Sequence, residues 1–427
     1  YKRQVKKMIK FGKWVVKFRI PILILSFLLL IPTGIIYMNT RINYDILSYL
    51  PGDIETMKGQ DILLDEFGTG AFSVAVIDGM QEKEISQLED KLKEIDHVKD
   101  VLWYGALADI SIPMDMLPDD LKDSLQNADT GSQLMIITFD TSMSADETLD
   151  AIEEIRGLTN EQCLLSGMSA VVTDIKKICN SEVIMYVVIA AGLSALVLAL
   201  TMDSFLLPFI FLLSIGMAIV YNLGTNFIAG EISFVTQALA AVLQLAVTMD
   251  YSIFLWHSYL ENQERYPDDK KRAMSHAISQ TLTSVVGSSI TTIAGFLAMC
   301  FMTFTLGMDL GIVMAKGVVF GVVGCVTILP AMILAMDKWI EKTRHKAIIP
   351  DLGRIGGFVT KHYWIFIILF LVIIGPAFYG QNHNQVYYDL VGTLPDNLES
   401  VKAGNALEND FDMGATHVIL ASSELNC

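Results

Sequence analysis

Seven long apolar stretches separated by polar segments dominate the hydrophobic pattern of the chain. They cover approximately residues 20–38, 183–200, 205–228, 232–256, 285–302, 310–336 and 364–378. A helix of about 18 or more apolar residues is long enough to cross roughly 30 Å of hydrocarbon. The first stretch is too long for a signal peptide and lacks a small-residue cleavage site. The pattern therefore predicts a polytopic α-helical membrane protein.

A different pattern occupies the segment between the first two stretches. Strand-like runs at Phe72–Ile77 and Leu134–Phe139 alternate with helical patterns at Lys83–Ile95 and Ala145–Arg156. Alternation of this kind is typical of βαβ units. We expect residues 40–182 to form one α+β domain, similar in plan to the porter domains of transporters.

Charge assigns an orientation to this arrangement. Lys and Arg are concentrated in residues 1–19, in the loop after the fourth stretch and in residues 337–362, as expected of cytoplasmic segments. The α+β domain is acidic and contributes most of the net charge of −17, so the sequence favours an extracytoplasmic position for it and no nucleic-acid partner. Mean hydropathy is +0.47, and we expect a multi-pass protein of a bacterial plasma membrane.

An internal repeat organises the rest of the chain. Tyr44-Asp45 recurs as Tyr388-Asp389, Leu50-Pro51 as Leu394-Pro395, and Phe67 as Phe411, each pair 344 positions apart. Each copy follows an apolar stretch. The sequence therefore predicts a duplicated unit, with spans at 20–38, within 183–336 (five spans) and at 363–380, and the truncated start of a second extracytoplasmic domain at 381–427.

The fourth stretch contains the candidate chemistry, because Asp250-Tyr251 lies in an otherwise apolar segment. A carboxylate near a helix centre costs roughly 2.5 to 3.5 kcal/mol on insertion scales, so it usually faces protein or water and has a function. Four accessory candidates are Lys316, which could pair with Asp250 or snorkel to the interface, His257 on the same face as Asp250, and Thr291 and Thr292, which could line a proton path. The rows Gly287, Thr291, Gly295 and Gly307, Gly311, Ala315 favour close helix packing.

The motifs around these residues resemble the MMPL branch of the RND superfamily. The resemblance rests on Thr248-Met249-Asp250-Tyr251-Ser252, on the run from Gly287 to Phe296 and on Leu329-Pro330-Ala331, together with the helix-domain-five-helix unit. It implies an RND-type duplicated architecture and a proton relay through Asp250 and Tyr251. In that family a second Asp-Tyr pair lies in the tenth helix, which would follow Cys427.

The resemblance implies a proton antiporter that exports lipids or other amphiphilic molecules. Two alternatives stay open: a sterol-sensing or Patched-like lipid sensor, and an accessory of protein export similar to SecD and SecF.

The sequence has no Walker A loop, HExxH or GxSxG motif, so no enzyme activity is indicated. Five scattered cysteines form no CxxC pair, and neither a metal site, a cofactor nor a disulfide is expected. Homo-oligomerisation stays open.

Overall fold

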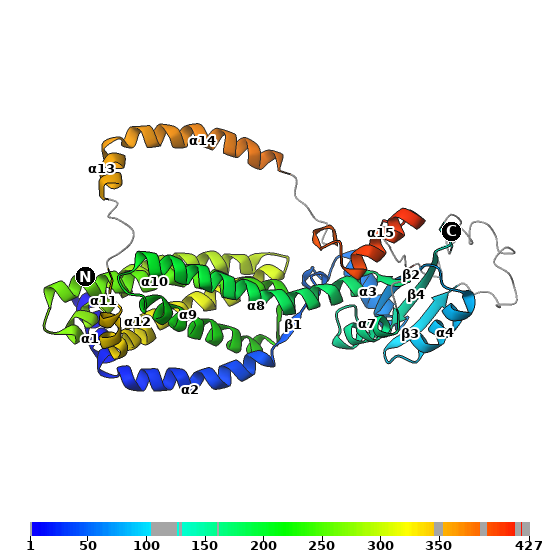
Figure 1. The fold of residues 1–427 in the computed structure, drawn as a ribbon, viewed down its shortest axis with the longest axis horizontal. Coiled ribbons are helices and arrows are strands. Elements are labelled where there is room, and N and C mark those ends of the chain that lie inside the picture. Colours follow the sequence, from blue (N-terminus) through cyan, green and yellow to red (C-terminus); the bar gives the residue numbers. More distant parts are fainter. Residues whose placement is uncertain are drawn as a thin grey trace.

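A computed structural model shows an elongated molecule with a helical bundle at one end and an α+β domain at the other (Figure 1). It describes residues 2–427 except 104–125, 128–129, 160–161, 346–352, 385–390, 415–419 and 421–427. The start of the second repeat copy, including Tyr388 and Asp389, lies outside the described residues.

The bundle consists of long apolar helices. Seven helices in the described ranges are long and apolar enough to cross a membrane, which confirms the polytopic fold class predicted from the sequence. The helices of the bundle are α1 (Lys2–Lys17), α2 (Arg19–Met38), α8 (Met168–Thr201), α9 (Leu207–Gly224), α10 (Phe234–Arg265), α11 (Lys270–Ala298) and α12 (Leu306–Lys342), and α13 (Gly353–Lys361) and α14 (Tyr363–His383) follow them along the chain.

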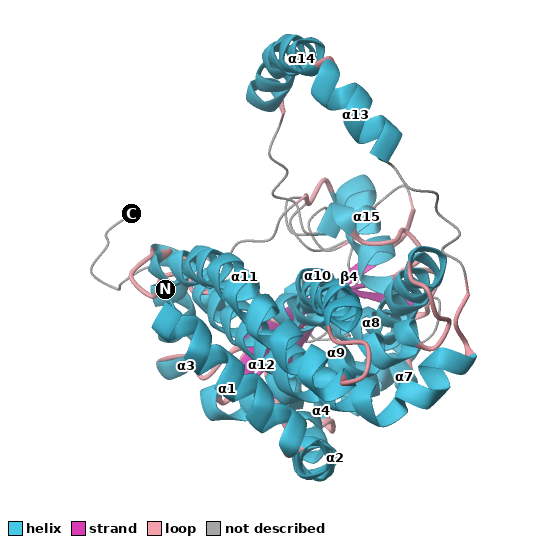
Figure 2. Ribbon diagram, turned by 90° about the vertical axis from the view of Figure 1, so that its left-hand side faces the viewer, coloured by secondary structure: helices cyan, strands magenta, loops and turns pink. Residues whose placement is uncertain are grey.

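Helix α12 lies at the centre of the bundle and packs against α9, α10 and α11. Their shared core includes Leu207, Phe211, Leu255, Ile278 and Leu329, all almost completely buried. Helix α1 packs on α11, and α2 packs on α9 and α12. By contrast, α14 has no buried residue, and both views show it standing apart from the bundle with α13 (Figures 1 and 2).

Short elements connect the two parts. They are β1 (Arg41–Asn43), the 3-10 turns η1 (Leu47–Tyr49), η3 (Thr225–Ala229) and η4 (Met299–Phe301), and β6 (Glu231–Ser233). Strand β1 pairs in parallel with β6, with Ile42 opposite Ile232, so the exit of α2 is fixed to the entrance of α10. The backbone N–H of Thr305 also donates to the carbonyl of Tyr49 over 2.9 Å, which ties η1 to the start of α12.

The α+β domain has a four-stranded antiparallel sheet in the order β3-β4-β2-β5. Two β-α-β units of the split type give this order, which is the α+β type of domain predicted from the sequence. The elements are α3 (Glu55–Asp65), β2 (Ala71–Ile77), α4 (Glu82–Lys93), β3 (Val98–Trp103), β4 (Gln133–Phe139), α7 (Asp146–Leu158) and β5 (Cys163–Ser166). The turn η5 (Val391–Thr393) and helix α15 (Glu399–Phe411) follow α14 along the chain.

Strand β2 is buried on both faces because side chains alternate along a strand. Ala75 and Ile77 face a core shared with α4 and α7, whereas Val74 and Val76 face α15. Cys163 lies in the first of these cores, and burial raises the pKa of its thiol to about 12. Cys179 belongs to a separate cluster.

The two predicted small-residue rows behave differently. A methyl group at Gly311 would lie 2.5 Å from the carbonyl oxygen of Phe296, so this row does serve close packing. A methyl group at Gly287 or Gly295 would meet nothing within 4 Å. Within the described residues the row on α11 contacts no other helix, because this face of α11 points away from the bundle, and its role in helix packing stays a prediction.

Candidate functional site

Asp250 lies at the middle of α10 and faces out of the bundle. Ala246, Asp250, Phe254 and His257 form an exposed stripe at intervals of three or four residues, which is one face of an α-helix. No hydrogen bond or ion pair among the described residues joins Asp250 to another of the predicted site residues. At membrane depth, an outward-facing carboxylate needs a polar or protein partner on that face.

Tyr251 lies about 100° around the helix from Asp250, on the buried side of α10, and is 5% exposed. It packs into the bundle core with Leu255 and Trp256. The thiol of Cys325 on α12 donates to the backbone carbonyl of Tyr251 over 3.2 Å, so the backbone at this point is tied to the central helix. The predicted relay residues are therefore neighbours in sequence that point in different directions.

Lys316 does not pair with Asp250, which corrects one of the two alternatives left by the sequence. Its ammonium group donates to Oδ1 of Asn226. Asn226 is 2% exposed, and beside it Nδ2 of Asn222 donates to Oε1 of Gln244 over 3.0 Å. We call Asn222, Asn226, Gln244 and Lys316 the inner amide cluster.

The inner amide cluster contains polar atoms without partners. Among the described residues, Oδ1 of Asn222, Nδ2 of Asn226 and Nε2 of Gln244 are buried and make no hydrogen bond. The hydroxyl of Thr248 donates to the carbonyl of Gln244 over 2.7 Å, which continues the polar side of α10 towards Tyr251. Buried polar groups of this kind usually bind water, an ion or a functional proton.

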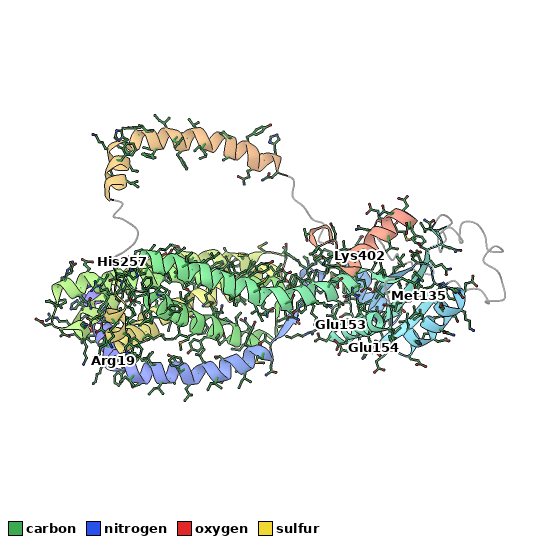
Figure 3. The ribbon with its side chains drawn as sticks, viewed as in Figure 1. Arg19, Met135, Glu153, Glu154, His257 and Lys402 are labelled. Carbon is green, nitrogen blue, oxygen red and sulfur yellow. The ribbon has the colours of Figure 1, made fainter. Side chains whose placement is uncertain are left out.

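The remaining predicted residues lie near the outward face. His257 is exposed at the end of the bundle remote from the α+β domain (Figure 3). Thr291 is exposed on α11, and its hydroxyl donates to the carbonyl of Ser288 over 2.7 Å. Thr292 donates to the same carbonyl over 3.1 Å. The two threonines thus bond to their own helix, and the structure brings neither into contact with Asp250.

A cavity of about 750 Å³ lies in the α+β domain between α3 and the sheet. Its lining is mainly apolar and includes Met57, Ile62, Leu63, Phe72, Met143 and Met168. Methionine side chains are flexible and polarisable, so they adapt to ligands of different shape. Sequence patterns did not indicate this cavity, because it forms between elements that are distant along the chain.

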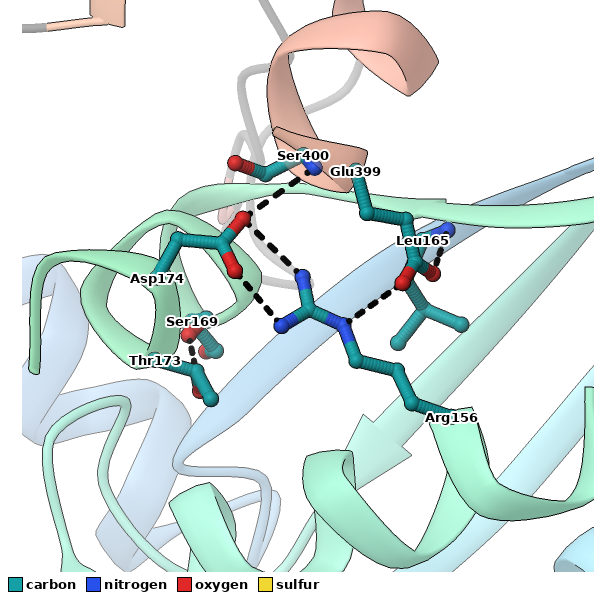
Figure 4. Close-up of polar contacts among 7 residues, drawn as sticks. All are labelled: Arg156, Leu165, Ser169, Thr173, Asp174, Glu399 and Ser400. Carbon is teal, nitrogen blue, oxygen red and sulfur yellow. Dashed lines mark hydrogen bonds and ion pairs between the residues drawn. The ribbon is translucent and has the colours of Figure 1, made fainter. Parts of the chain in front are cut away.

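A charged network joins the α+β domain to the second repeat copy (Figure 4). The guanidinium of Arg156 binds both carboxylate oxygens of Asp174, over 2.7 and 3.1 Å. Its Nε lies 3.2 Å from Glu399 at the start of α15, and the N–H of Ser400 donates to Asp174 over 3.2 Å. Arg156 and Asp174 are largely buried, so this bidentate pair fixes α15 on the domain.

Sequence comparison assigns this architecture to a family. The profile of the MMPL family matches residues 68–362, from the α+β domain to the linker after α12. The chain belongs to the MMPL family. With its apolar helices, this MMPL protein is a multi-pass bacterial membrane protein.

Curated relatives of this MMPL protein are membrane and transport proteins. It is 24% identical over 370 residues to the "Probable transport protein MmpL12" of Mycobacterium tuberculosis, and the match covers 83% of this chain and 30% of that protein. It is 20% identical over 418 residues to the "Apo-petrobactin exporter" of Bacillus anthracis, covering 86% of this chain and 55% of that protein. The MMPL chain described here thus spans about a third to a half of these relatives.

One solved structure is also similar in outline. SecDF in its super-membrane-facing form aligns with 77% of this chain and 39% of its own, at a TM-score of 0.41 and 15% sequence identity.

Proposed function

We propose that this MMPL chain is the first half of a proton-driven exporter of hydrophobic or amphiphilic molecules. The outward-facing carboxylate of Asp250 at the middle of α10 carries the proposal. A charge at this depth, exposed on the surface of a bundle, is disfavoured unless a second protein surface or water covers it. In the full-length protein, the second half supplies that surface, and Asp250 takes up and releases a proton there.

Other features support the outward face of α10 and α11 as the meeting surface of the two halves. The exposed part of α11 presents small residues, including Gly287, Thr291 and Gly295, and small residues permit close approach of helices in a membrane. Tyr251 holds this part of α10 in place from within the bundle core, because its backbone carbonyl accepts a hydrogen bond from Cys325 on α12. His257, Thr291 and Thr292 lie beside the path of the proton.

The cavity in the α+β domain is the proposed binding site for the transported molecule. Its size is within the range typical of small-molecule sites, and its methionine-rich apolar lining suits acyl chains or other hydrophobic groups. The names of the relatives, a probable transport protein and an apo-petrobactin exporter, agree with a role in transport. In this arrangement the α+β domain lies outside the cytoplasmic membrane and α1 inside.

Transport in membrane vesicles tests the proposal. The full-length protein is assayed with a fluorescent acyl-chain lipid as the probe, with and without an imposed pH gradient. We expect Asp250→Asn to insert normally and to lose gradient-driven movement of the probe, because the amide keeps the shape but cannot carry a proton. Tyr251→Phe should reduce movement less. A gradient-independent binding of the probe in the parental protein, with no movement, would support a lipid sensor.

A further inference from the structure

Helices α3 and α15 are structural counterparts in the two repeat copies. Each follows a 3-10 turn, η1 or η5, and the two turns and the two helices each begin 344 positions apart. Their ends match as well: Gly68 and Asp412, also 344 positions apart, both adopt left-handed backbone conformations with φ of 59° and 53°. The repeat therefore extends from sequence to backbone geometry.

Helix α15 packs on the sheet of the other copy. It belongs to the second repeat, yet Leu407 is 5% exposed and packs with Val74 and Val76 on the first sheet. Val401 is buried and Phe411 is partly buried on the same helix. Figure 1 shows α15 lying across this sheet, and Arg156 holds its first turn through Glu399.

Helix α3 has the same apolar positions but no buried residue. Met57, Leu63 and Phe67 are the counterparts of Val401, Leu407 and Phe411 in the repeat. Phe67 is 54% exposed and Ile62 is 43% exposed. The amphipathic face that buries α15 is therefore present on α3, and it is only partly covered there: Met57 and Leu63 line the cavity, and Phe67 is exposed.

A residue of the second copy already reaches this partly covered face. Leu420 lines the cavity together with Ile62 and Leu63 of α3. In the repeat, Leu420 is the counterpart of Val76, the residue of β2 that packs against α15. The packing of Val76 against α15 thus has a reverse counterpart in the position of Leu420 beside α3.

We propose that the two α+β domains of the full-length protein exchange these helices. Helix α3 covers the sheet of the second domain, just as α15 covers the first sheet. Glu55, the counterpart of Glu399, then lies beside the position of the second domain that corresponds to Arg156. Each domain is then completed by a helix from the other half.

The exchange has a consequence for movement. Two domains that each hold a helix of the other cannot separate without exposing two apolar faces, so relative motion is confined to sliding or tilting. The methionine-lined cavity then lies at the interface that both domains form. This assignment concerns assembly and does not depend on the proposed proton relay.

Paired cysteines in the full-length protein test the exchange. The background protein lacks its native cysteines and carries an engineered protease site between His345 and Gly353. The double variant Leu63→Cys, Leu420→Cys is treated in membranes with a short bismaleimide and is then cleaved at this site. We expect the two fragments to stay linked after cleavage. Val76→Cys with Leu407→Cys is the positive control, because these side chains share one buried cluster.

Asp65→Cys with Leu420→Cys is the matched negative control, because Asp65 is exposed at the end of α3. Linking of Val76 and Leu407 without linking of Leu63 and Leu420 would overturn the proposal. So would a product of doubled mass, which would show exchange between two polypeptides. Hydrogen exchange gives a second measurement: α3 should be protected to the same degree as α15, and a much faster exchange of α3 would also contradict the proposal.

Discussion

At the scale of the residue, Asp250 and Tyr251 show what a sequence can and cannot predict about a membrane site. An acid in an apolar span is visible from the sequence, and the structure places it at the middle of α10. Its direction could not be predicted, because α10 also carries polar side chains such as Gln244 and Thr248, and packing decides which side of the helix faces inward. The contact of Lys316 with Asn226 was also not predicted. Amides within apolar spans, such as Asn222 and Gln244, are nevertheless a signal in the sequence for a buried polar cluster.

The contact between Lys316 and Asn226 leads to a prediction about stability. Lys316→Met leaves Oδ1 of Asn226 buried without its donor, and an unpaired buried polar group costs about 1–3 kcal/mol. We expect Asn226→Leu to be destabilising as well, and the double variant to lose less stability than the sum of the two. Thermal unfolding of the full-length protein in detergent measures all three. Strict additivity would show that the two side chains do not interact.

At the scale of the element, the sequence predicted most helices and strands because their patterns are local. The predicted strands at Phe72–Ile77 and Leu134–Phe139 correspond to β2 and β4, and the helical patterns after them correspond to α4 and α7. The partner of an amphipathic helix is set by tertiary packing and was not predictable. Nothing local in Glu399–Phe411 indicates that α15 covers the sheet of the first domain.

Close contact between α12 and α10 also depends on a glycine, Gly321, that belongs to neither of the two small-residue rows predicted from the sequence. A methyl group at Gly321 would lie 2.0 Å from Cγ2 of Thr248 on α10. We expect Gly321→Ala to destabilise the bundle by about 1–3 kcal/mol through overpacking. Gly216→Ala on α9 is the control, since a methyl group there meets nothing within 4 Å and alanine favours a helix. Equal melting temperatures of the two variants in detergent would contradict this packing.

At the scale of the whole molecule, one repeat unit explains why several surfaces of this chain are uncovered. The outward face of α10 and α11, part of the apolar face of α3 and the whole of α14 are exposed here. The sequence repeat predicts a second unit that would cover such surfaces, and the relatives are longer than this chain. Duplicated halves that meet at a shared site are a common plan among transporters.

Proton uptake by the reconstituted full-length protein tests the central claim most directly. Liposomes containing a pH-sensitive dye and a fluorescent acyl-chain lipid are given a pH gradient, and internal pH is followed in the parental protein, in Asp250→Asn and in Ser288→Ala as a variant of the neighbouring exposed face. We predict lipid-dependent proton flux in the parental protein and in Ser288→Ala, and its loss in Asp250→Asn. Flux at the parental rate in Asp250→Asn would contradict the role of Asp250 as the proton carrier.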